Sequence, residues 1–279
     1  MIVNLDVEHP EEVPVRNAAT VMLVRDADDG VEVFMLRRNL NSDFVGGAYV
    51  FPGGGVDLGD AATDLEEICV GRSDVDASAL LDIEEGGLSF WVAAIRESFE
   101  EAGLLLAVDP SGEMVRFDDE ATNDRFVVHR RHVDSGERSL LDVAREEGLH
   151  LATDRIHYFS RWITPLGAPR RYDTRFFIAH PPEWQVPVHD DHEVIANLWI
   201  SPAEALERHA RGEFELIFPT VRSLEALQRF ATADEVVKHA ASIARIDPIL
   251  PKIEESASGL RIVLPGDEIY DAITSKRIE

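Results

Sequence analysis

Cysteine is almost absent from this sequence, because Cys69 is the only one among its 279 residues. An intrachain disulfide and a zinc site built from several cysteines are therefore both excluded. Long apolar segments are missing as well: no run of 18 apolar residues occurs, and nothing is expected to span a membrane. Residues 1–8 lack the basic and apolar regions of a secretory signal, so we expect a cytoplasmic protein.

Positively charged residues are also scarce, since 27 lysines and arginines stand against 53 aspartates and glutamates, for a net charge of −26. Nucleic acids and anionic membranes attract proteins through lysine and arginine, so we expect neither a nucleic acid polymer nor a membrane as a partner. The large negative charge has two interpretations: it keeps the surface soluble, or it reflects adaptation to high salt. In either case an anionic substrate needs a locally basic or metal-lined site.

Hydrophobic residues make up 45% of the chain and charged residues 29%, which is typical of a soluble protein with a substantial core. Apolar runs separated by turn residues predict individual strands and helices along the chain. A turn ending at Gly30 joins the first two strands into a hairpin, and Ser201 with Pro202 is typical of a helix start, so helices are expected over 202–245. The predicted strands are 18–25, 31–38, 158–163, 174–179, 194–200 and 259–264.

One predicted helix, at residues 93–104, carries an unusual concentration of acidic residues. Glu97, Glu100 and Glu101 fall within an arc of about 100°, because a helix turns once in about 3.6 residues. The opposite side is an apolar stripe that would face a core, consisting of Val92, Ile95, Phe99 and Ala102.

The three carboxylates oppose the stability of the helix on which they lie. Like charges three or four residues apart repel each other, and the helix dipole disfavours anions near the C-terminal end, where Gly103 is expected to end the helix. A divalent cation would relieve this repulsion, because Mg²⁺ and Mn²⁺ prefer hard oxygen ligands. A solvated acidic face is the alternative interpretation.

The pattern around these glutamates resembles the Nudix box, G-x5-E-x7-R-E-U-x-E-E-x-G-U, in which U is bulky and apolar. Gly54 begins the match, and Arg96 to Leu104 supply the second half. Asp60 stands where the box has its first glutamate. Residues 61–95 replace the usual seven, so the box contains a 28-residue insertion.

A long insertion at this point is typical of the peroxisomal coenzyme A diphosphatase branch of the Nudix hydrolases, which the chain resembles over residues 17–270. The resemblance implies a Nudix-type α/β/α sandwich with a mixed sheet, a helical insertion in the box and C-terminal helices. It divides the chain into an arm at 1–16, a Nudix domain at 17–245 with its insertion at 61–92, and an extension at 246–279 packing on the same domain. The segments that match in order are FPGG at 51–54, WITP at 162–165, RYDTRFF at 171–177, LWISP at 198–202 and LPGDEIY at 264–270.

The resemblance also implies a metal site. Glu97, Glu100 and Glu101 would hold Mg²⁺ or Mn²⁺, and a carbonyl of the glycine turn, assigned to Gly54, would join the metal shell. Arg96 would orient a box carboxylate by ion pairing.

A further carboxylate is expected just before the strand at 194–200, as a metal ligand or general base. Glu193 is the first choice and Asp191 the second, with a solvated loop as the alternative. Glu97 or Glu193 would accept a proton from the attacking water.

Arginines at 161–175 form the clearest basic cluster of the chain, and planar guanidinium groups suit phosphate binding. Arg161, Arg171 and Arg175 are assigned to substrate binding, although each could instead pair with a nearby acid. Arg38 is assigned to the same role because it fits the branch's signature before the glycine turn. Asp43 stands where that signature has a second arginine, so other substrates stay open.

Three functions follow from this resemblance. The first is cleavage of the diphosphate bond of coenzyme A or acyl-coenzyme A, and the second is the same reaction on nucleotide sugars, dinucleotides or oxidised nucleotides. The third is a non-catalytic Nudix domain that senses a nucleotide. The insertion at 61–92 would form a helical flap beside the site or an oligomer contact, residues 110–156 are expected to be irregular, and a homodimer is common in the family.

Overall fold

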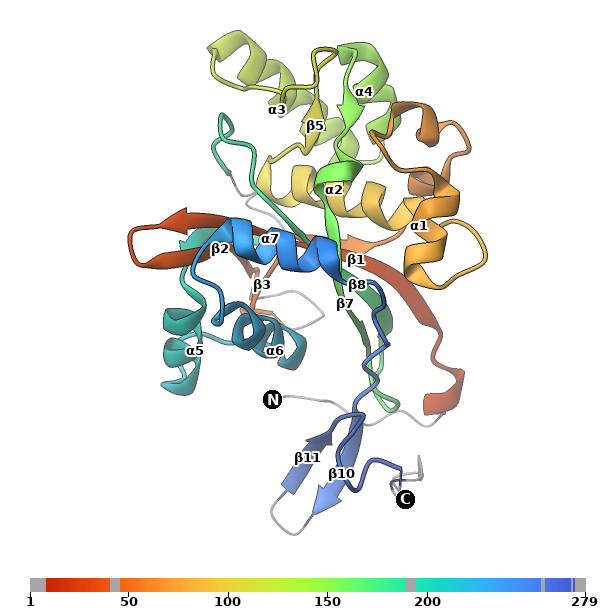
Figure 1. The fold of residues 1–279 in the computed structure, drawn as a ribbon, viewed down its shortest axis with the longest axis vertical. Helices are drawn as coiled ribbons and strands as arrows, with labels where there is room; N and C mark the ends of the chain where they lie inside the picture. Colours follow the sequence, from red (N-terminus) through yellow and green to blue (C-terminus); the bar gives the residue numbers. More distant parts are fainter. Residues whose placement is uncertain (1–8, 41–45, 189–193, 257–258, 272, 274–279) are drawn as a thin grey trace.

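The computed structural model describes residues 9–40, 46–188, 194–256, 259–271 and 273 of the chain. A central mixed sheet has helices packed on both faces, which confirms the expected α/β/α sandwich (Figure 1). Among the described residues, no helix combines the length and the apolar character that a membrane crossing requires.

The sheet has seven strands within the described residues. Strands β3, β2, β1, β8 and β7 lie side by side in that order, while β4 also pairs with β1 and β9 with β2. Strands β1 and β8 run parallel and the other pairs run antiparallel, so the sheet is mixed as expected. The strands are β1 Val15–Ala27, β2 Gly30–Arg38, β3 Tyr49–Val50, β4 Gly53–Gly55, β7 His157–Ile163, β8 Arg171–Ala179 and β9 Val194–Ile200.

Side-chain alternation along the strands divides the core into two layers. On β1, Val21 and Leu23 face one layer, whereas Met22 and Val24 face the other. The first layer is completed by helix α2, Leu88–Ala102. The second layer is completed by three helices, α5 Pro202–Ala210, α6 Phe218–Leu227 and α7 Ala233–Ser242.

The helices of the second layer agree with the expectation for residues 202–245. The Ser201 hydroxyl accepts a hydrogen bond from the Glu204 backbone N–H, and Pro202 occupies the first helical turn, so the predicted helix start is confirmed. The predicted helical stretch is divided into three helices. The first break begins at Arg211, just after α5, and the second ends at Thr232, just before α7.

The insertion in the box is helical, as predicted. The 3₁₀ helix η2, Leu58–Ala61, leads into it. The insertion itself contains the 3₁₀ helix η3 Leu65–Ile68 and the helix α1 Asp74–Leu81, and it ends by extending α2 at its N-terminal side. The Asp74 carboxylate accepts hydrogen bonds from the backbone N–H groups of Gly86 and Leu88, each at 2.9 Å. Since unpaired N–H groups are left at a helix start, the insertion caps the helix that it precedes.

Residues 110–156 are more regular than the sequence predicted. They form helix α3, Glu120–Asp134, and helix α4, Leu140–Glu147, which are capped by the side chains of Asp119 and Ser139. Helix α4 ends at Gly148, which adopts the left-handed conformation with φ 65°. Around these helices lie η4 Thr153–Arg155 and a two-stranded sheet of β5 Ala107–Val108 and β6 His150–Leu151.

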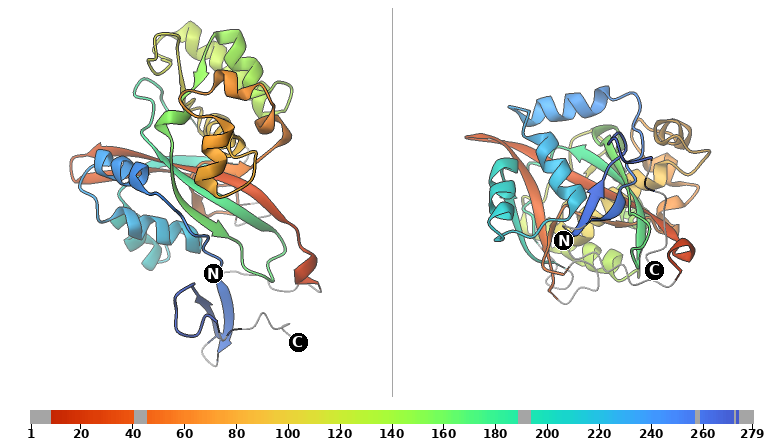
Figure 2. Two further views of the ribbon diagram at one scale, coloured as in Figure 1. Left: turned by 45° about the vertical axis from the view of Figure 1, so that its right-hand side comes forward. Right: turned by 90° about the horizontal axis from the view of Figure 1, so that it is seen from below.

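The C-terminal extension forms a hairpin of β10, Lys252–Ser256, and β11, Gly259–Val263, so the predicted strand at 259–264 is confirmed. The hairpin lies at the opposite end of the molecule from α3 and α4 (Figures 1 and 2). Ile249, just before it, exchanges backbone hydrogen bonds with Arg161 and Ile163 of β7, at 2.8 and 2.9 Å. At the other terminus, residues 1–8 of the expected arm lie outside the described residues, and the 3₁₀ helix η1 Pro10–Glu12 precedes β1.

Candidate active site

Helix α2 holds its acidic residues in place because the rest of its surface is buried. Ile95 and Phe99 pack in the first core layer, and the Trp91 indole N–H donates to the Ile156 carbonyl at 2.9 Å. The helix ends at Gly103, whose φ of 70° is the left-handed conformation expected of a glycine stop. The box glutamates are thus carried by a rigid element.

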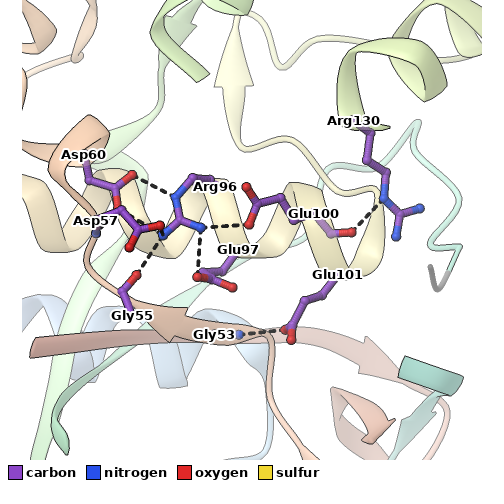
Figure 3. Close-up of polar contacts among 9 residues, drawn as sticks. All are labelled: Gly53, Gly55, Asp57, Asp60, Arg96, Glu97, Glu100, Glu101 and Arg130. Carbon is purple, nitrogen blue, oxygen red and sulfur yellow. Dashed lines mark hydrogen bonds and ion pairs between the residues drawn. The ribbon is translucent and has the colours of Figure 1, made fainter. Parts of the chain in front are cut away.

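Arg96 is the centre of the acidic cluster (Figure 3). Its Nε and Nη2 donate to the two carboxylate oxygens of Asp60 at 2.9 and 3.0 Å. Its Nη1 donates to Glu97 at 2.9 Å and to Glu100 at 2.7 Å. Asp60 therefore contacts Arg96 from across the insertion, and the expected role of Arg96 in orienting box carboxylates agrees with these contacts.

The glycine turn, strand β4, approaches the same cluster from the other side. The Gly53 backbone N–H donates to Glu101 Oε2 at 2.9 Å, and the Gly55 carbonyl accepts from Arg96 Nη2 at 2.7 Å (Figure 3). A Cβ atom on Gly54 would overlap the Glu97 carboxylate, so a larger residue there would displace Glu97 from the cluster. The predicted place of the Gly54 carbonyl in a metal shell stays a prediction.

Burial disfavours the ionised form of the carboxylates in this cluster. It raises the pKa of Glu97 well above the usual value, since Arg96 offsets only part of the cost and Glu101 and Glu100 add repulsion. Burial also raises the pKa of Glu100 to about 7, against the opposing effect of Arg96. The pKa of Asp60 rises for the same reason. One guanidinium does not neutralise the carboxylates gathered around it.

The donor set fits a divalent cation of the Mg²⁺ type. Glu97, Glu100 and Glu101 offer hard carboxylate oxygens, and burial leaves their negative charge poorly compensated. A bound cation would supply the missing positive charge and favour the ionised form of each group.

The carboxylates lie on the wall of one large cleft of about 1420 Å³. Near the cluster, the wall continues through the glycine turn and through the turn between α3 and α4, at residues 133–141. Away from the cluster, the wall is formed mainly by apolar side chains. They are Phe51, Trp162, Phe176, Leu216, Ile217, Phe218, Pro251 and Ile262.

A family model described as the NUDT19 Nudix domain matches residues 74–227, which is more than half of the chain. The chain belongs to the Nudix family. It is a Nudix hydrolase, and it resembles the branch that the sequence indicated.

Named relatives agree with this assignment. The chain is 27% identical over 304 residues to a protein of Gallus gallus named acyl-coenzyme A diphosphatase NUDT19, covering 91% of this chain and 79% of the relative. It is 26% identical over 291 residues to the Homo sapiens protein of that name, covering 87% and 73%. The crystal structure of a Nudix hydrolase from Alicyclobacillus acidocaldarius superposes with a TM-score of 0.68 at 27% identity, covering 85% of this chain and 100% of that one.

Among the arginines assigned to substrate binding, the structure places Arg38 on the wall of the Nudix cleft. Arg161 donates to both carboxylate oxygens of Asp173 at 2.9 and 2.7 Å, and Arg175 pairs with the same carboxylate at 2.9 Å. Arg171 donates to the Thr164 carbonyl at 3.1 Å.

These positions contradict a substrate-binding role for Arg161 and Arg175, because neither reaches the cleft wall. Neighbouring residues of the same strands, Trp162 and Thr174, do line the cleft. Since successive side chains of a strand point to opposite faces, the two arginines point to the other side of the sheet, where Arg175 lies 4.2 Å from the ring centre of Phe90. Arg171 is also absent from the wall, whereas Arg170 lies on it.

Glu193 and Asp191 lie outside the described residues, so their assignment as general base or ligand stays a prediction. The segment that leads to them is attached to the end of α2. Val188 N–H donates to the Ala102 carbonyl at 2.9 Å. Arg130 of α3 donates from Nε to the Glu100 carbonyl at 2.8 Å and from Nη1 to the Val188 carbonyl at 2.6 Å.

Arg130 is a site residue that the sequence prediction missed. No role was assigned to residues 110–156 from the sequence, but Arg130 points at the end of the box helix (Figure 3). The spacing of Phe126, His129 and Val133, which are the buried residues of α3, is the signal that could have shown which face is solvated.

A second group of metal-ligand side chains lies away from the carboxylate cluster, at His129, Glu146 and Glu147. Two arginines already neutralise it, because Arg125 pairs with Glu147 at 2.8 Å and Arg138 with Glu146 at 2.6 Å. The two clusters therefore differ in charge balance, and only the box cluster has surplus negative charge facing the cleft.

Proposed function

We propose that this Nudix hydrolase is a divalent-metal-dependent diphosphatase that cleaves the diphosphate bond of coenzyme A or an acyl-coenzyme A. The observation that carries the proposal is the cluster of box glutamates around one arginine at the wall of a large cleft. The names of the relatives support the substrate class, since both relatives described above are called acyl-coenzyme A diphosphatases.

In this proposal Glu97, Glu100 and Glu101 hold Mg²⁺ or Mn²⁺ together with the Gly54 carbonyl. Such an ion neutralises charge on phosphate oxygens and lowers the pKa of water. Arg96 keeps Glu97 and Glu100 in place through hydrogen bonds of 2.9 and 2.7 Å. The Gly53 N–H fixes Glu101 in the same way.

The proton of the attacking water needs an acceptor, and Glu97 is suited to this role. Its raised pKa makes it a stronger base than an ordinary carboxylate once it is ionised. Glu193 remains the other assignment for this role. Attack by the water oxygen at one phosphorus breaks its bond to the bridging oxygen, which leaves as part of a phosphate.

Recognition of the anionic substrate falls to a cationic group on the cleft wall. Arg38 lies there, and its buried Nε–H has no hydrogen-bond partner among the described residues. A buried donor without a partner favours a ligand that accepts its hydrogen bond, and a phosphate oxygen does so with charge assistance.

The test is a panel of diphosphate compounds incubated with the protein and either Mg²⁺ or Mn²⁺, with the products identified by mass. Coenzyme A and acyl-coenzyme A should yield adenosine 3′,5′-bisphosphate and the corresponding phosphopantetheine. Hydrolysis restricted to nucleotide sugars, dinucleotides or oxidised nucleotides would overturn the substrate class. Binding without turnover of any compound would overturn the enzymatic proposal in favour of a sensor.

A further inference from the structure

The cleft is chemically different at its two ends. The box cluster occupies one end, and the apolar wall extends toward the C-terminal hairpin, which lies far from α2 (Figures 1 and 2). At the apolar end, Trp162 and Phe218 pack edge to face with ring centres 5.9 Å apart. Glu215 and Arg170, which have opposite charges, also lie on the cleft wall.

The C-terminal hairpin is a fixed part of this wall. Pro251 and Ile262 both line the cleft. The segment before Pro251 is attached to β7 through Ile249, and the Tyr270 hydroxyl donates to the Leu250 carbonyl at 2.7 Å. Lys252 donates to the Tyr270 carbonyl at 2.8 Å and lies 4.1 Å from the centre of its ring.

The cleft is larger than a diphosphate needs. Its volume of about 1420 Å³ exceeds the range of about 300–1000 Å³ that is usual for pockets of small ligands. The carboxylate cluster would take the diphosphate, so room remains along the apolar wall. A flexible hydrocarbon chain gains affinity there, because each fully buried CH₂ group contributes up to about four-fold.

We propose that the apolar end of the cleft binds the acyl chain of an acyl-coenzyme A, and that the C-terminal hairpin, through Ile262 and Pro251, sets the preference for chain length. This inference rests on the proposed function. The hairpin lies outside residues 74–227, the part that the family model matches, so this part of the cleft wall is supplied from outside the matched domain.

The test compares kcat/KM for coenzyme A, acetyl-, octanoyl- and lauroyl-coenzyme A, all below their micellar concentrations. In the wild type, the value for lauroyl-coenzyme A should exceed that for coenzyme A by about ten-fold or more. In Ile262→Glu this ratio should fall close to one, because a carboxylate disfavours an apolar ligand.

The matched control is Leu260→Glu, which adds the same charge to the same strand. Leu260 is 54% exposed and does not line the cleft, so the ratio should stay at the wild-type value. Ile262→Trp fills the cleft without adding charge, and it should move the preferred substrate from lauroyl- to octanoyl-coenzyme A. This second variant keeps the test decisive if Ile262→Glu folds poorly.

A wild-type ratio close to one would overturn the inference, as would equal changes of the ratio in Ile262→Glu and Leu260→Glu. An equal loss of kcat/KM for coenzyme A and every acyl-coenzyme A in Ile262→Glu would also overturn it, because it would assign the apolar end to the adenine ring.

A binding measurement separates this inference from the proposed function. Dodecyl phosphate and butyl phosphate are titrated into the protein by calorimetry, which requires no hydrolysis. Tighter binding of dodecyl phosphate that is lost in Ile262→Glu and kept in Leu260→Glu would support the apolar subsite even if coenzyme A were not cleaved. Equal binding of the two alkyl phosphates would count against the subsite whatever the substrate.

Discussion

Two buried clusters of arginines and carboxylates pack against helix α2, and they differ in charge balance. Around Arg96, one guanidinium contacts Asp60, Glu97 and Glu100, and Glu101 nearby accepts a hydrogen bond from the glycine turn. Around Asp173, one carboxylate is shared by Arg161 and Arg175. The first cluster faces the cleft and has surplus negative charge, whereas the second is closed off from the cleft.

The contrast shows that arginine and carboxylate side chains serve stability in one cluster and can serve cation binding in the other. Arg175 is 2% exposed, and burial lowers its pKa even though Asp173 opposes the change. A closed cluster of this kind fixes strands β7 and β8 against α2. The Arg96 cluster has an uncompensated charge at an open wall, which is the arrangement that a cation can complete.

The strongest way to break the first cluster is Glu100→Gln. The change keeps the size of the side chain and removes one charge, so we expect kcat/KM to fall by about 1000-fold, comparable to the loss of a key electrostatic group in other enzymes. The melting temperature should not fall, because a buried charge is removed. Steady-state kinetics with saturating Mg²⁺ and circular dichroism measure the two quantities.

A matched control for Glu100→Gln is Glu147→Gln, in the neutralised group near His129. It should keep wild-type kcat/KM. Full activity in Glu100→Gln would reject the assignment of the box cluster as the active site.

The second cluster should respond in stability and not in chemistry. Asp173→Ala leaves Arg161 and Arg175 without their shared carboxylate, which should lower the free energy of unfolding by about 3 kcal/mol. Chemical denaturation measures this change, and kcat of the folded protein should remain within about two-fold. The exposed ion pair of Asp234 with Lys238 supplies the control, since Asp234→Ala should cost less than about 1 kcal/mol. A loss of kcat in Asp173→Ala as large as that in Glu100→Gln would erase the distinction between the clusters.

Arg96→Lys sharpens the comparison from inside the active cluster. Lysine keeps the positive charge but cannot donate to Asp60, Glu97 and Glu100 at the same time. We expect kcat/KM to fall by about 10- to 100-fold, which is usual when a group that orients metal ligands is lost. Unchanged kinetics would mean that charge alone, without the hydrogen bonds, orders the carboxylates.

The smallest effect concerns the pH dependence of stability without metal. The pKa of Glu100 is about 7 in the folded protein and higher than in the unfolded chain, so the folded state binds more protons between these values. Stability in EDTA should therefore fall as pH rises from about 5 to 8, and the melting temperature should drop by about 3 °C or more. Glu100→Gln should show a shallower decline, as should the wild type in Mg²⁺. Equal slopes in the wild type and the variant would contradict the raised pKa.

Much of the fold could be predicted because local patterns agreed with the tertiary structure. The apolar stripe and Gly103 defined α2, and the runs around Gly30 defined the hairpin of β1 and β2. Helix α3 was missed because most of its residues are polar, and three buried side chains give a weak periodic signal. Its packing depends on α2, which a local pattern does not show.

The site could be predicted where residues lie on one element and not where strands combine. Glu97, Glu100 and Glu101 share a helix, so their spacing in sequence gives their spacing in the structure. Arg161 and Arg175 were grouped by sequence distance, but the direction of each side chain depends on the face of the strand. Asp60 reaches Arg96 only because the insertion folds back to the box helix.

A titration with Mn²⁺ tests most directly whether the box cluster holds the catalytic cation. Binding is measured as the loss of the free-ion signal in electron paramagnetic resonance. The wild type, Glu100→Gln and Glu147→Gln are titrated under the same conditions. The proposal predicts that Glu100→Gln weakens Mn²⁺ binding by about ten-fold or more and that Glu147→Gln leaves it unchanged. Equal affinity in the wild type and Glu100→Gln, or a loss confined to Glu147→Gln, would contradict it.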